Sequence, residues 1–175
     1  DSIAVNGVCV SVVTVDARAF TCELIEETCR LTTLGTIRAG APVNLEPSLR
    51  IADRLSGHIV LGHVDGMGTV LRRRTHQGEL MLQLRLPAAL TRGVVSKGPI
   101  TVDGVSLTVG STPTASTCCL HLIPETMRLT TLSGRQVGEH VNIELDYFAK
   151  LIAHMLKRRS TLRPASPSVF GGQYT

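Results

Sequence analysis

The chain has 175 residues, of which 43% are hydrophobic, 18% charged and 3% aromatic, and its formal net charge is +4. This length allows one ordinary domain or two small ones, and the hydrophobic fraction excludes a chain that is disordered by composition. The low aromatic content disfavours modules that bind nucleic acid by stacking bases on aromatic rings. Because the excess positive charge is concentrated at residues 72–74 and 157–159, we interpret it as solvated surface, with an anion site as the alternative.

The predicted elements are mostly short strands separated by turn signals. In the first residues, apolar and polar side chains alternate around Asn6-Gly7, which predicts a strand, a turn and a second strand. Strand-like runs follow along the whole chain, at residues 2–5, 8–14, 20–24, 43–45, 68–71, 80–86, 100–102, 106–109, 118–122 and 141–144. Short strands at such spacing predict small β-barrels or sandwiches.

Short helices are predicted between some of these strands. Residues 28–34 and 126–132 follow acidic side chains and fit either short helices or extended connections. Residues 48–55 and the segment PAALTRGVV at residues 87–95 also fit short helices. These segments would connect the strands without forming a layer of their own.

The last predicted helix is DYFAKLIAHMLKRR at residues 146–159, which Asp146 can cap. An apolar stripe recurs along it at helical spacing, formed by Phe148, Leu151, Ile152, Met155 and Leu156. The stripe predicts either packing on the chain's own β structure or self-association. The tail at residues 160–175 is predicted to be disordered.

Three blocks of the sequence occur twice in the same order. SIAVNGVCVSV at residues 2–12 matches PITVDGVSLTV at residues 99–109 in five of eleven positions, with an offset of 97. ELIEETCRLTTL at residues 23–34 matches HLIPETMRLTTL at residues 121–132 in nine of twelve, with an offset of 98, and VNLE then falls on VNIE. The chain therefore contains two copies of one module, which we assign to residues 1–67 and 68–145.

The two modules differ in what precedes their shared hairpin. In the second module the hairpin follows residues 68–98, which contain two predicted strands and a short helix, whereas the first module has no counterpart. We expect the first module to lack roughly thirty residues, which are either missing from this sequence or lost by the protein. We favour missing residues, because two lost strands would leave an open sheet edge with unpaired backbone groups.

Residues with chemical potential occupy equivalent positions in the two modules but differ in kind. The differing pairs are Cys9 and Ser106, Ser11 and Thr108, Asn6 and Asp103, and Glu26 and Pro124. Such exchanges of hydroxyl, thiol and carboxylate groups fit two sites with different roles, although drift also produces them.

Histidine, lysine and cysteine residues allow further interpretations. GHIVLGHVDG carries His58 and His63 five residues apart, on opposite faces of an alternating strand, so a shared metal ion is not predicted. Each histidine is either a polar residue with its hydrogen bonds satisfied or a catalyst. Lys97 is either a surface charge or a ligand contact. Cys9 is either a buried small hydrophobic residue or a nucleophile. From the residues alone we reach a duplicated β protein with a polar pocket, and the reaction stays open.

The five cysteines show no C-x-x-C spacing, which favours free thiols in a reducing compartment. No apolar run reaches the length of a membrane helix and no signal peptide is recognised, so neither a membrane nor nucleic acid is predicted as a partner.

Six blocks together resemble the riboflavin synthase family of the alpha-subunit type, over residues 2–156. They are SIAVNGVCVSV, ELIEETCRLTTL, GHIVLGHVDG, SKGPITVDGVSLTV, HLIPETMRLTTL and VNIELD. The resemblance implies an all-β fold of two tandem six-stranded Greek-key barrels, followed by a C-terminal α-helix. It also implies that a Phe-Thr-Gly-Ile segment bordering the active site belongs to the portion missing from the first module.

The resemblance further implies a dismutation without cofactor or metal. Two molecules of 6,7-dimethyl-8-ribityllumazine would exchange a four-carbon unit and give riboflavin and 5-amino-6-(D-ribitylamino)uracil. The family's homotrimer, joined through the C-terminal helices, would place each site between the first barrel of one subunit and the second barrel of the next. Expected partners are this lumazine, riboflavin and, as a further prediction, lumazine synthase. The expected location is the cytoplasm, or the plastid stroma in a plant or alga.

Site residues are carried over by motif from the same resemblance. The catalytic residues it implies are Ser2, Cys9 and His63, with His63 assisting proton transfer. The substrate-binding residues it implies in the first module are Cys9, Val10, Ser11, Glu23, Leu24, Ile25, Glu26, Glu27, Thr28, Gly62, His63 and Val64. Those it implies in the second module are Lys97, Asp103, Ser106, Leu107, Thr108, His121, Leu122, Ile123, Pro124, Glu125 and Thr126. Two alternatives stay open: a lumazine- or flavin-binding protein without turnover, and a structural subunit of a larger assembly.

Overall fold

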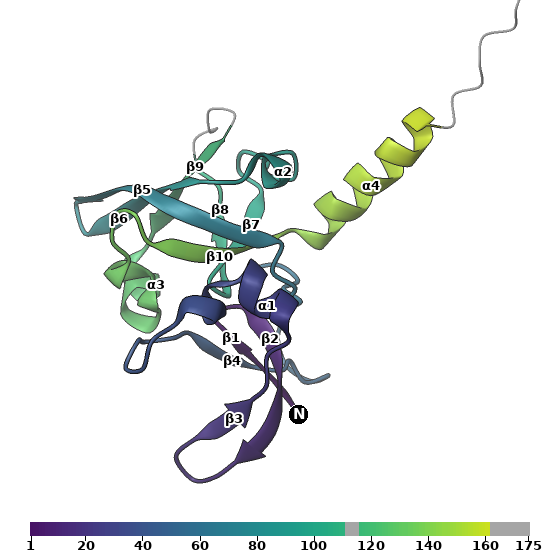
Figure 1. Cartoon of the computed structure of the whole chain (residues 1–175). Helices are drawn as coiled ribbons and strands as arrows, with labels where there is room; N and C mark the ends of the chain where they lie inside the picture. Colours follow the sequence, from purple (N-terminus) through teal and green to yellow (C-terminus); the bar gives the residue numbers. More distant parts are fainter. Residues whose placement is uncertain (111–115, 162–175) are drawn as a thin grey trace, which may run out of the picture.

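The computed structural model describes residues 1–110 and 116–161 (Figure 1). The first module contains β1 (Ser2–Val5), β2 (Val8–Val15), β3 (Phe20–Cys22), α1 (Glu26–Leu31), the 3-10 helix η1 (Thr33–Thr36) and β4 (Leu45–Pro47). The second contains β5 (Gly66–His76), β6 (Glu79–Arg85), α2 (Ala88–Thr91), β7 (Pro99–Val102), β8 (Val105–Thr108), β9 (Thr117–Leu122), α3 (Pro124–Leu129), η2 (Thr131–Gly134) and β10 (His140–Leu145). The last helix is α4 (Tyr147–Thr161).

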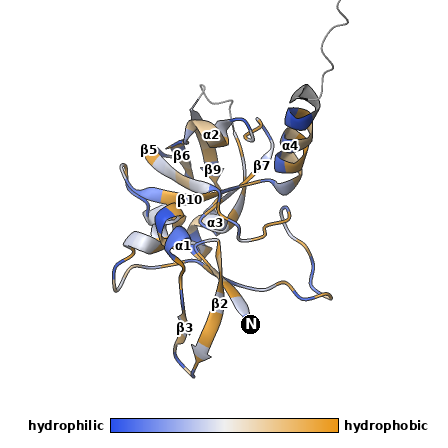
Figure 2. Ribbon diagram, turned by 45° about the vertical axis from the view of Figure 1, so that its right-hand side comes forward, coloured by the Kyte–Doolittle hydropathy of each residue, from blue (hydrophilic) through white to orange (hydrophobic). Residues whose placement is uncertain are grey.

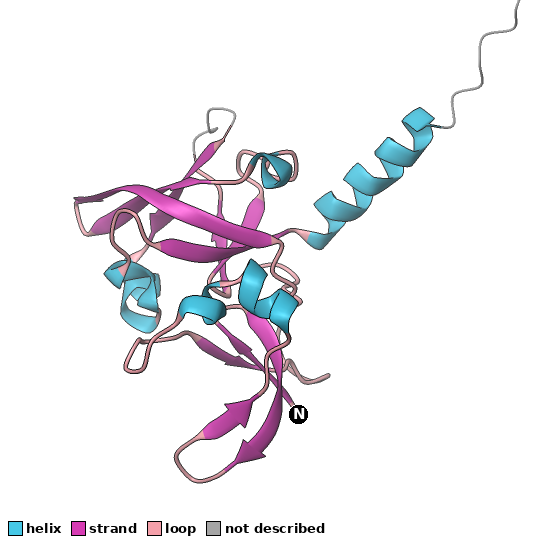
Figure 3. Cartoon of the chain, viewed as in Figure 1, coloured by secondary structure: helices cyan, strands magenta, loops and turns pink. Residues whose placement is uncertain are grey.

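Each module forms an antiparallel sheet. The N-terminal sheet has the order β3-β2-β1-β4, and the C-terminal sheet has the order β8-β7-β10-β5-β6-β9. In the C-terminal sheet the edge strands β8 and β9 also meet, through a bridge between Val109 and Leu120. The additional strands β5 and β6 are those that the repeat comparison left without a counterpart. The predicted all-β fold with a C-terminal helix is confirmed (Figure 3).

The larger core lies inside the C-terminal sheet. Along β6 the side chains alternate between buried and less buried, and Leu82 and Leu84 are completely buried together with Leu120 of β9 and Ile143 of β10. Each such leucine contributes about 1.5–3 kcal/mol relative to an exposed one. The N-terminal sheet has a smaller core around Val5, Val8, Val10 and Leu34.

The two modules meet through a nearly symmetric set of hydrogen bonds. The Asn142 side chain donates from Nδ2 to the Asn6 carbonyl at 2.9 Å and accepts the Thr33 amide at 2.8 Å. The equivalent Asn44 donates from Nδ2 to the Asp103 carbonyl at 2.9 Å and accepts the Thr131 amide at 2.8 Å. This exchange fixes the β1–β2 hairpin against the β7–β8 hairpin.

At the centre of this junction the two hairpin turns are in backbone contact. Gly7 has φ +76°, and a Cβ there would lie 2.5 Å from the Gly104 nitrogen. Beside it, Asp103 is completely buried, and its carboxylate accepts from Arg135 Nη2 at 2.7 Å. Burial raises the pKa of the Asp103 carboxyl, and the Arg135 guanidinium opposes that rise. The first module has Asn6 and Ile37 at these positions, so this charge pair occurs on one side of the junction.

The C-terminal helix projects away from both sheets (Figure 1). As predicted, Asp146 caps it, because Asp146 Oδ1 accepts the Ala149 amide at 2.9 Å. The predicted apolar stripe is exposed, with Ile152 58% and Met155 62% accessible, and apolar and polar residues alternate around the helix in Figure 2. α4 extends to Thr161, two residues into the predicted tail, and the rest of that tail lies outside the described residues. Among the described residues no helix is long and apolar enough to span a membrane.

Some local predictions differ from the structure. Residues 48–55 are not helical: the Asp53 carboxylate accepts the Arg50 amide at 2.8 Å in a turn, and Ile51 is fully exposed. A helix this short gains too little from its own hydrogen bonds to form without burying a face. Strand β4 begins at Leu45, two residues later than predicted. Of the two alternatives for residues 28–34 and 126–132, the short helices are confirmed: in each segment an α-helix is followed by a short 3-10 helix.

Candidate functional site

The connecting segment, residues 57–64, passes both hairpins and brings one Gly-His pair to each. The Cys9 amide donates to the Gly62 carbonyl at 2.9 Å, and a Cβ on Gly62 would lie 2.7 Å from the Cys9 Cβ. Only glycine fits there, since Gly62 also has φ +76°. The predicted catalytic residues Cys9 and His63 thus lie on two segments that are hydrogen-bonded to each other next to both residues, and both residues are exposed.

The second hairpin receives the other Gly-His pair. A Cβ on Gly57 would lie 2.4 Å from Ser106 Oγ, so Gly57 approaches Ser106 as Gly62 approaches the equivalent Cys9. The His58 ring then makes two contacts, with Nδ1 2.7 Å from Ser106 Oγ and Nε2 3.0 Å from Thr101 Oγ1. In the first module Ala4 and Cys9 occupy the corresponding positions, and no hydrogen bond of the His63 ring is present within residues 1–110 and 116–161.

A buried carboxylate holds the connecting segment in place. Glu144 on β10 is 3% accessible and accepts the amides of Leu61 at 2.8 Å and Gly62 at 3.0 Å. Next along the chain, Asp65 accepts the Leu145 amide at 2.8 Å and Lys150 Nζ at 2.9 Å. The backbone that carries His63 is therefore anchored to the C-terminal sheet, although Cys9 belongs to the N-terminal one.

The other predicted site segments lie before α1 and α3. Ile25 and Ile123 precede these helices in extended conformation and are 69% and 57% accessible. In the second module Arg128 Nη2 donates to Glu125 Oε1 at 2.6 Å, and this hydrogen bond lowers the pKa of the Glu125 carboxyl. Both segments thus present exposed apolar side chains and backbone groups beside their sheets.

The predicted site residues divide by exposure. Those at least partly accessible are Ser2, Cys9, Ser11, Glu23, Leu24, Ile25, Glu26, Glu27, Thr28, His63, Val64, Lys97, Ser106, Leu107, Thr108, His121, Ile123, Pro124, Glu125 and Thr126. Val10, Gly62, Asp103 and Leu122 are buried. The side chains of Val10 and Leu122 pack in the cores and that of Asp103 lies in the junction, so a ligand reaches these residues only through backbone groups or after a rearrangement.

The strand register brings two predicted residues together in the first hairpin, whereas in the second each predicted residue of β8 faces a residue of β7 that was not predicted. Ser2 lies opposite Ser11 on β1 and β2, and Thr108 lies opposite Pro99 on β7 and β8. Lys97 adopts φ 64°, and its amide donates to the Val109 carbonyl at 3.0 Å, which ties it to the end of β8. His121, by contrast, faces Glu79 on β6, with Nδ1 4.0 Å from the carboxylate.

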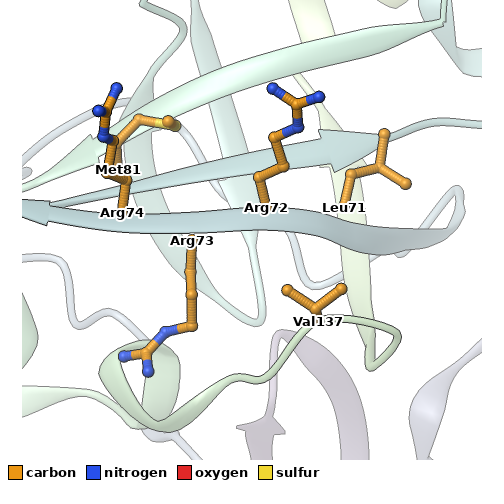
Figure 4. A pocket seen from close by; sticks show the side chains of 6 residues that line it. All are labelled: Leu71, Arg72, Arg73, Arg74, Met81 and Val137. Carbon is orange, nitrogen blue, oxygen red and sulfur yellow. The ribbon is translucent and has the colours of Figure 1, made fainter.

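A separate cavity of about 520 Å³ lies beside Arg72, Arg73 and Arg74 on β5 (Figure 4). The Arg73 side chain points to the opposite side of the strand from Arg72 and Arg74, and its Nη2 donates to the Ser133 carbonyl at 3.1 Å. The three guanidinium groups therefore do not converge on one anion. This arrangement agrees with our interpretation of the cluster as solvated surface, and the cavity includes none of the predicted site residues.

Sequence reasoning missed the residues that position the site. Thr101, Glu144 and the pair Asn44 and Asn142 were not predicted, and His58 was left between two interpretations. The VNLE and VNIE repeat pointed to Asn44, Asn142 and Glu144, yet nothing in it indicated that these side chains bond across the two modules. Within the described residues, no group of three or more His, Cys, Asp or Glu side chains has the geometry to hold a metal ion.

Comparison with known proteins places this architecture in a class. The family model described as the lumazine binding domain matches residues 1–48 and 61–146, so the duplicated sheets and paired hairpins define a protein with tandem domains of this class. The fold is also that of LumP, in crystal structures with 6,7-dimethyl-8-(1'-D-ribityl) lumazine (TM-score 0.73, 22% identity, covering 82% of this chain and 76% of that one) and with riboflavin (TM-score 0.74, 23% identity, covering 82% and 77%).

Curated relatives give the particular family. Riboflavin synthase of Mycobacterium tuberculosis is 43% identical over 161 residues, which cover 90% of this chain and 80% of that protein. Riboflavin synthases of Actinobacillus pleuropneumoniae and Escherichia coli are 36% and 35% identical, over 95% and 90% of this chain and 77% and 74% of those proteins. The chain belongs to the riboflavin synthase family.

Proposed function

We propose that the protein is a riboflavin synthase, which converts two molecules of 6,7-dimethyl-8-ribityllumazine into riboflavin and 5-amino-6-(D-ribitylamino)uracil. The observation that carries the proposal is the pair of hairpins β1–β2 and β7–β8. The two hairpins have the same backbone, and each lies next to its own Gly-His pair. Their side chains differ, because Cys9 and Ala4 in the first hairpin correspond to Ser106 and Thr101 in the second. This asymmetry fits a reaction in which two identical molecules take different roles, one giving and one receiving the four-carbon unit.

The first module has the groups for proton transfer and addition. His63 is exposed and directly follows Gly62, whose carbonyl accepts the Cys9 amide. In the proposed mechanism His63 takes a proton from the acidic methyl group of the lumazine, while Cys9 and Ser2 assist addition or orient the ring. General acid–base catalysis of this kind contributes roughly 10²–10⁴-fold.

The largest contribution to the rate in this proposal is proximity. Two rings held face to face react as one unit, and effective molarities for well-oriented groups reach about 10⁵–10⁸ M. We assign lumazine-binding domains to residues 1–67 and 68–145, with Ile25 and Ile123 beside the rings and their backbone groups at the ring edges. Lys97, Ser106 and Thr108 would hold the second molecule.

We also propose that the protein is a homotrimer. α4 leaves both sheets with Phe148, Leu151 and Ile152 between 42% and 58% accessible, and such an apolar stripe is stabilised by burial against a second copy. The first module of one subunit would then face the second module of its neighbour.

All five cysteines are free, which supports a reducing compartment such as the cytoplasm. Association with lumazine synthase stays a prediction.

The proposal is tested by following riboflavin formation from 6,7-dimethyl-8-ribityllumazine without added cofactor, using the full-length protein. We expect turnover, and we expect His63→Gln to lower kcat about a hundredfold. His76→Gln is the matched control, since His76 is an exposed histidine at the end of β5. Binding of the lumazine without product would instead indicate a binding protein, and the absence of both would indicate a structural subunit.

A further inference from the structure

His58 connects a buried threonine to a candidate ligand-binding serine. Thr101 on β7 and Ser106 on β8 are direct cross-strand neighbours, and the His58 ring reaches both hydroxyls at 3.0 Å and 2.7 Å. Thr101 is 1% accessible, whereas Ser106 is half-buried at the surface of the hairpin. The three side chains therefore form a chain of hydrogen bonds that leads from the protein interior to the candidate site.

The burial of Thr101 determines which group donates and which accepts in each of these hydrogen bonds. A neutral imidazole carries one N–H donor and one acceptor nitrogen, so two arrangements are possible. If Nε2–H donated to Thr101, the hydroxyl hydrogen of Thr101 would need another acceptor, and none is present among the described residues. A buried donor without a partner is costly. The favoured arrangement therefore has Thr101 O–H donating to Nε2 and Nδ1–H donating to Ser106 Oγ.

From this geometry we propose that Thr101 and His58 are positioning residues that make Ser106 a hydrogen-bond donor toward the ligand. Because Ser106 Oγ already accepts from His58, its own hydrogen is free to point at an acceptor, such as a carbonyl oxygen or a ring nitrogen of a heteroaromatic ligand. The first module lacks this device, since Ala4 and Cys9 stand at the equivalent positions. The second module thus selects ligands by an acceptor atom at a defined place, and the first does not.

This inference rests on the proposed function in one respect, namely that a lumazine contacts Ser106. The direction of the hydrogen bonds does not depend on it. The first experiment is therefore made on the ligand-free protein, with ¹⁵N-labelled histidine. We expect the His58 ring, assigned by its loss in His58→Gln, to be protonated at Nδ1 and to show one tautomer. Protonation at Nε2 would overturn the proposal, because Ser106 would then donate to His58 and offer the ligand an acceptor.

The second experiment compares threonine variants. Thr101→Val keeps the shape and removes the donor, so His58 is no longer held in one tautomer. A neutral hydrogen bond contributes about a factor of five in affinity, and we expect one of the two binding steps for 6,7-dimethyl-8-ribityllumazine to weaken by about that factor. KM should rise accordingly, while kcat changes less than twofold. Thr101→Ser, which restores the hydroxyl, should behave as the wild type.

The matched control is Thr69→Val. Thr69 Oγ1 is also in contact with a histidine, His140 Nδ1 at 3.2 Å, but this pair lies on β5 and β10 away from Ser106. Equal effects of Thr101→Val and Thr69→Val, or no effect of Thr101→Val on the His58 tautomer, would contradict the proposal. A wild type that binds the lumazine and forms no riboflavin would refute the proposed activity, yet the tautomer and the affinities would still decide the roles of Thr101 and His58.

Discussion

The β1–β2 and β7–β8 hairpins have the same backbone, and the surroundings of their central residues make them different. Next to Cys9 lie Gly62 and an exposed His63, with Ala4 across the strand pair. Next to Ser106 lies His58, held at both ring nitrogens. The comparison shows where a duplicated module keeps its structure and where it varies: both copies share the backbone contacts of the junction, while the side chains around Cys9 and Ser106, which we propose contact the ligand, differ between them.

The largest expected effect comes from disturbing the shared backbone. In Gly7→Ala the new Cβ would lie 2.5 Å from the Gly104 nitrogen, a backbone atom that cannot move without separating the hairpins. We expect a loss of about 4 kcal/mol or more in the free energy of unfolding. Chemical denaturation followed by circular dichroism measures it.

The control for this variant is Gly78→Ala. Gly78 has a similar φ of +82°, but no atom lies within 4 Å of its Cβ position. It should therefore show the cost of the left-handed backbone alone, about 1 kcal/mol. If the two variants are equally destabilised, the close approach of the two turns contributes nothing to stability.

A smaller effect is expected from the asparagines that join the modules. Asn142→Ala leaves the Thr33 amide and the Asn6 carbonyl without their partner, and Asn142 is 1% accessible. We expect a loss of about 3 kcal/mol in the free energy of unfolding, since each buried unsatisfied group costs about 1–3 kcal/mol. Thermal or urea unfolding measures this change.

The equivalent Asn44→Ala sharpens the comparison between the modules. Asn44 makes the same two bonds across the junction but is only half-buried, so water can replace part of them. The free energy of unfolding lost in Asn44→Ala should therefore be about half of that lost in Asn142→Ala. A larger loss for Asn44→Ala would mean that the symmetry of the junction does not extend to its energetics.

The sequence allowed the fold to be predicted because the repeat reports on both copies at once. Matching blocks defined the hairpins, identified the strands β5 and β6 that occur in one module, and aligned Cys9 with Ser106. The positioning of the site could not be predicted, because it depends on contacts between segments far apart in the chain. His58 meets Thr101 only where the connecting segment passes the second hairpin, and Glu144 binds the Leu61 amide across 83 positions. The short helix predicted at residues 48–55 was wrong, because Leu49, Ile51 and Leu55 are exposed and no other element covers them.

The smallest predicted effect concerns a thiol that distinguishes the two sheets. Cys118 on β9 occupies the position of Phe20 in the first module and is completely buried. Burial, followed by the neighbouring Cys119, raises the pKa of the Cys118 thiol from 9.0 to about 12. Between these values the unfolded chain has lost the thiol proton and the folded protein has kept it, so ionisation favours unfolding, and stability falls as the pH rises from 9 toward 12.

Cys118→Ala removes this dependence on pH. The variant should be less stable than the wild type at pH 8 because of the cavity it leaves. The difference in the free energy of unfolding between the wild type and the variant, called the gap below, should narrow by about 1.4 kcal/mol for each pH unit above 9. This is because one pKa unit corresponds to about that free energy. Urea unfolding at pH 8, 9 and 10 measures the gap. Val109→Ala is the control, because Val109 is equally buried and does not ionise, so its gap should stay constant. A constant gap for Cys118→Ala as well would show that the thiol ionises as readily in the folded protein as in the unfolded chain, and that the interior of the C-terminal sheet is open to water at β9.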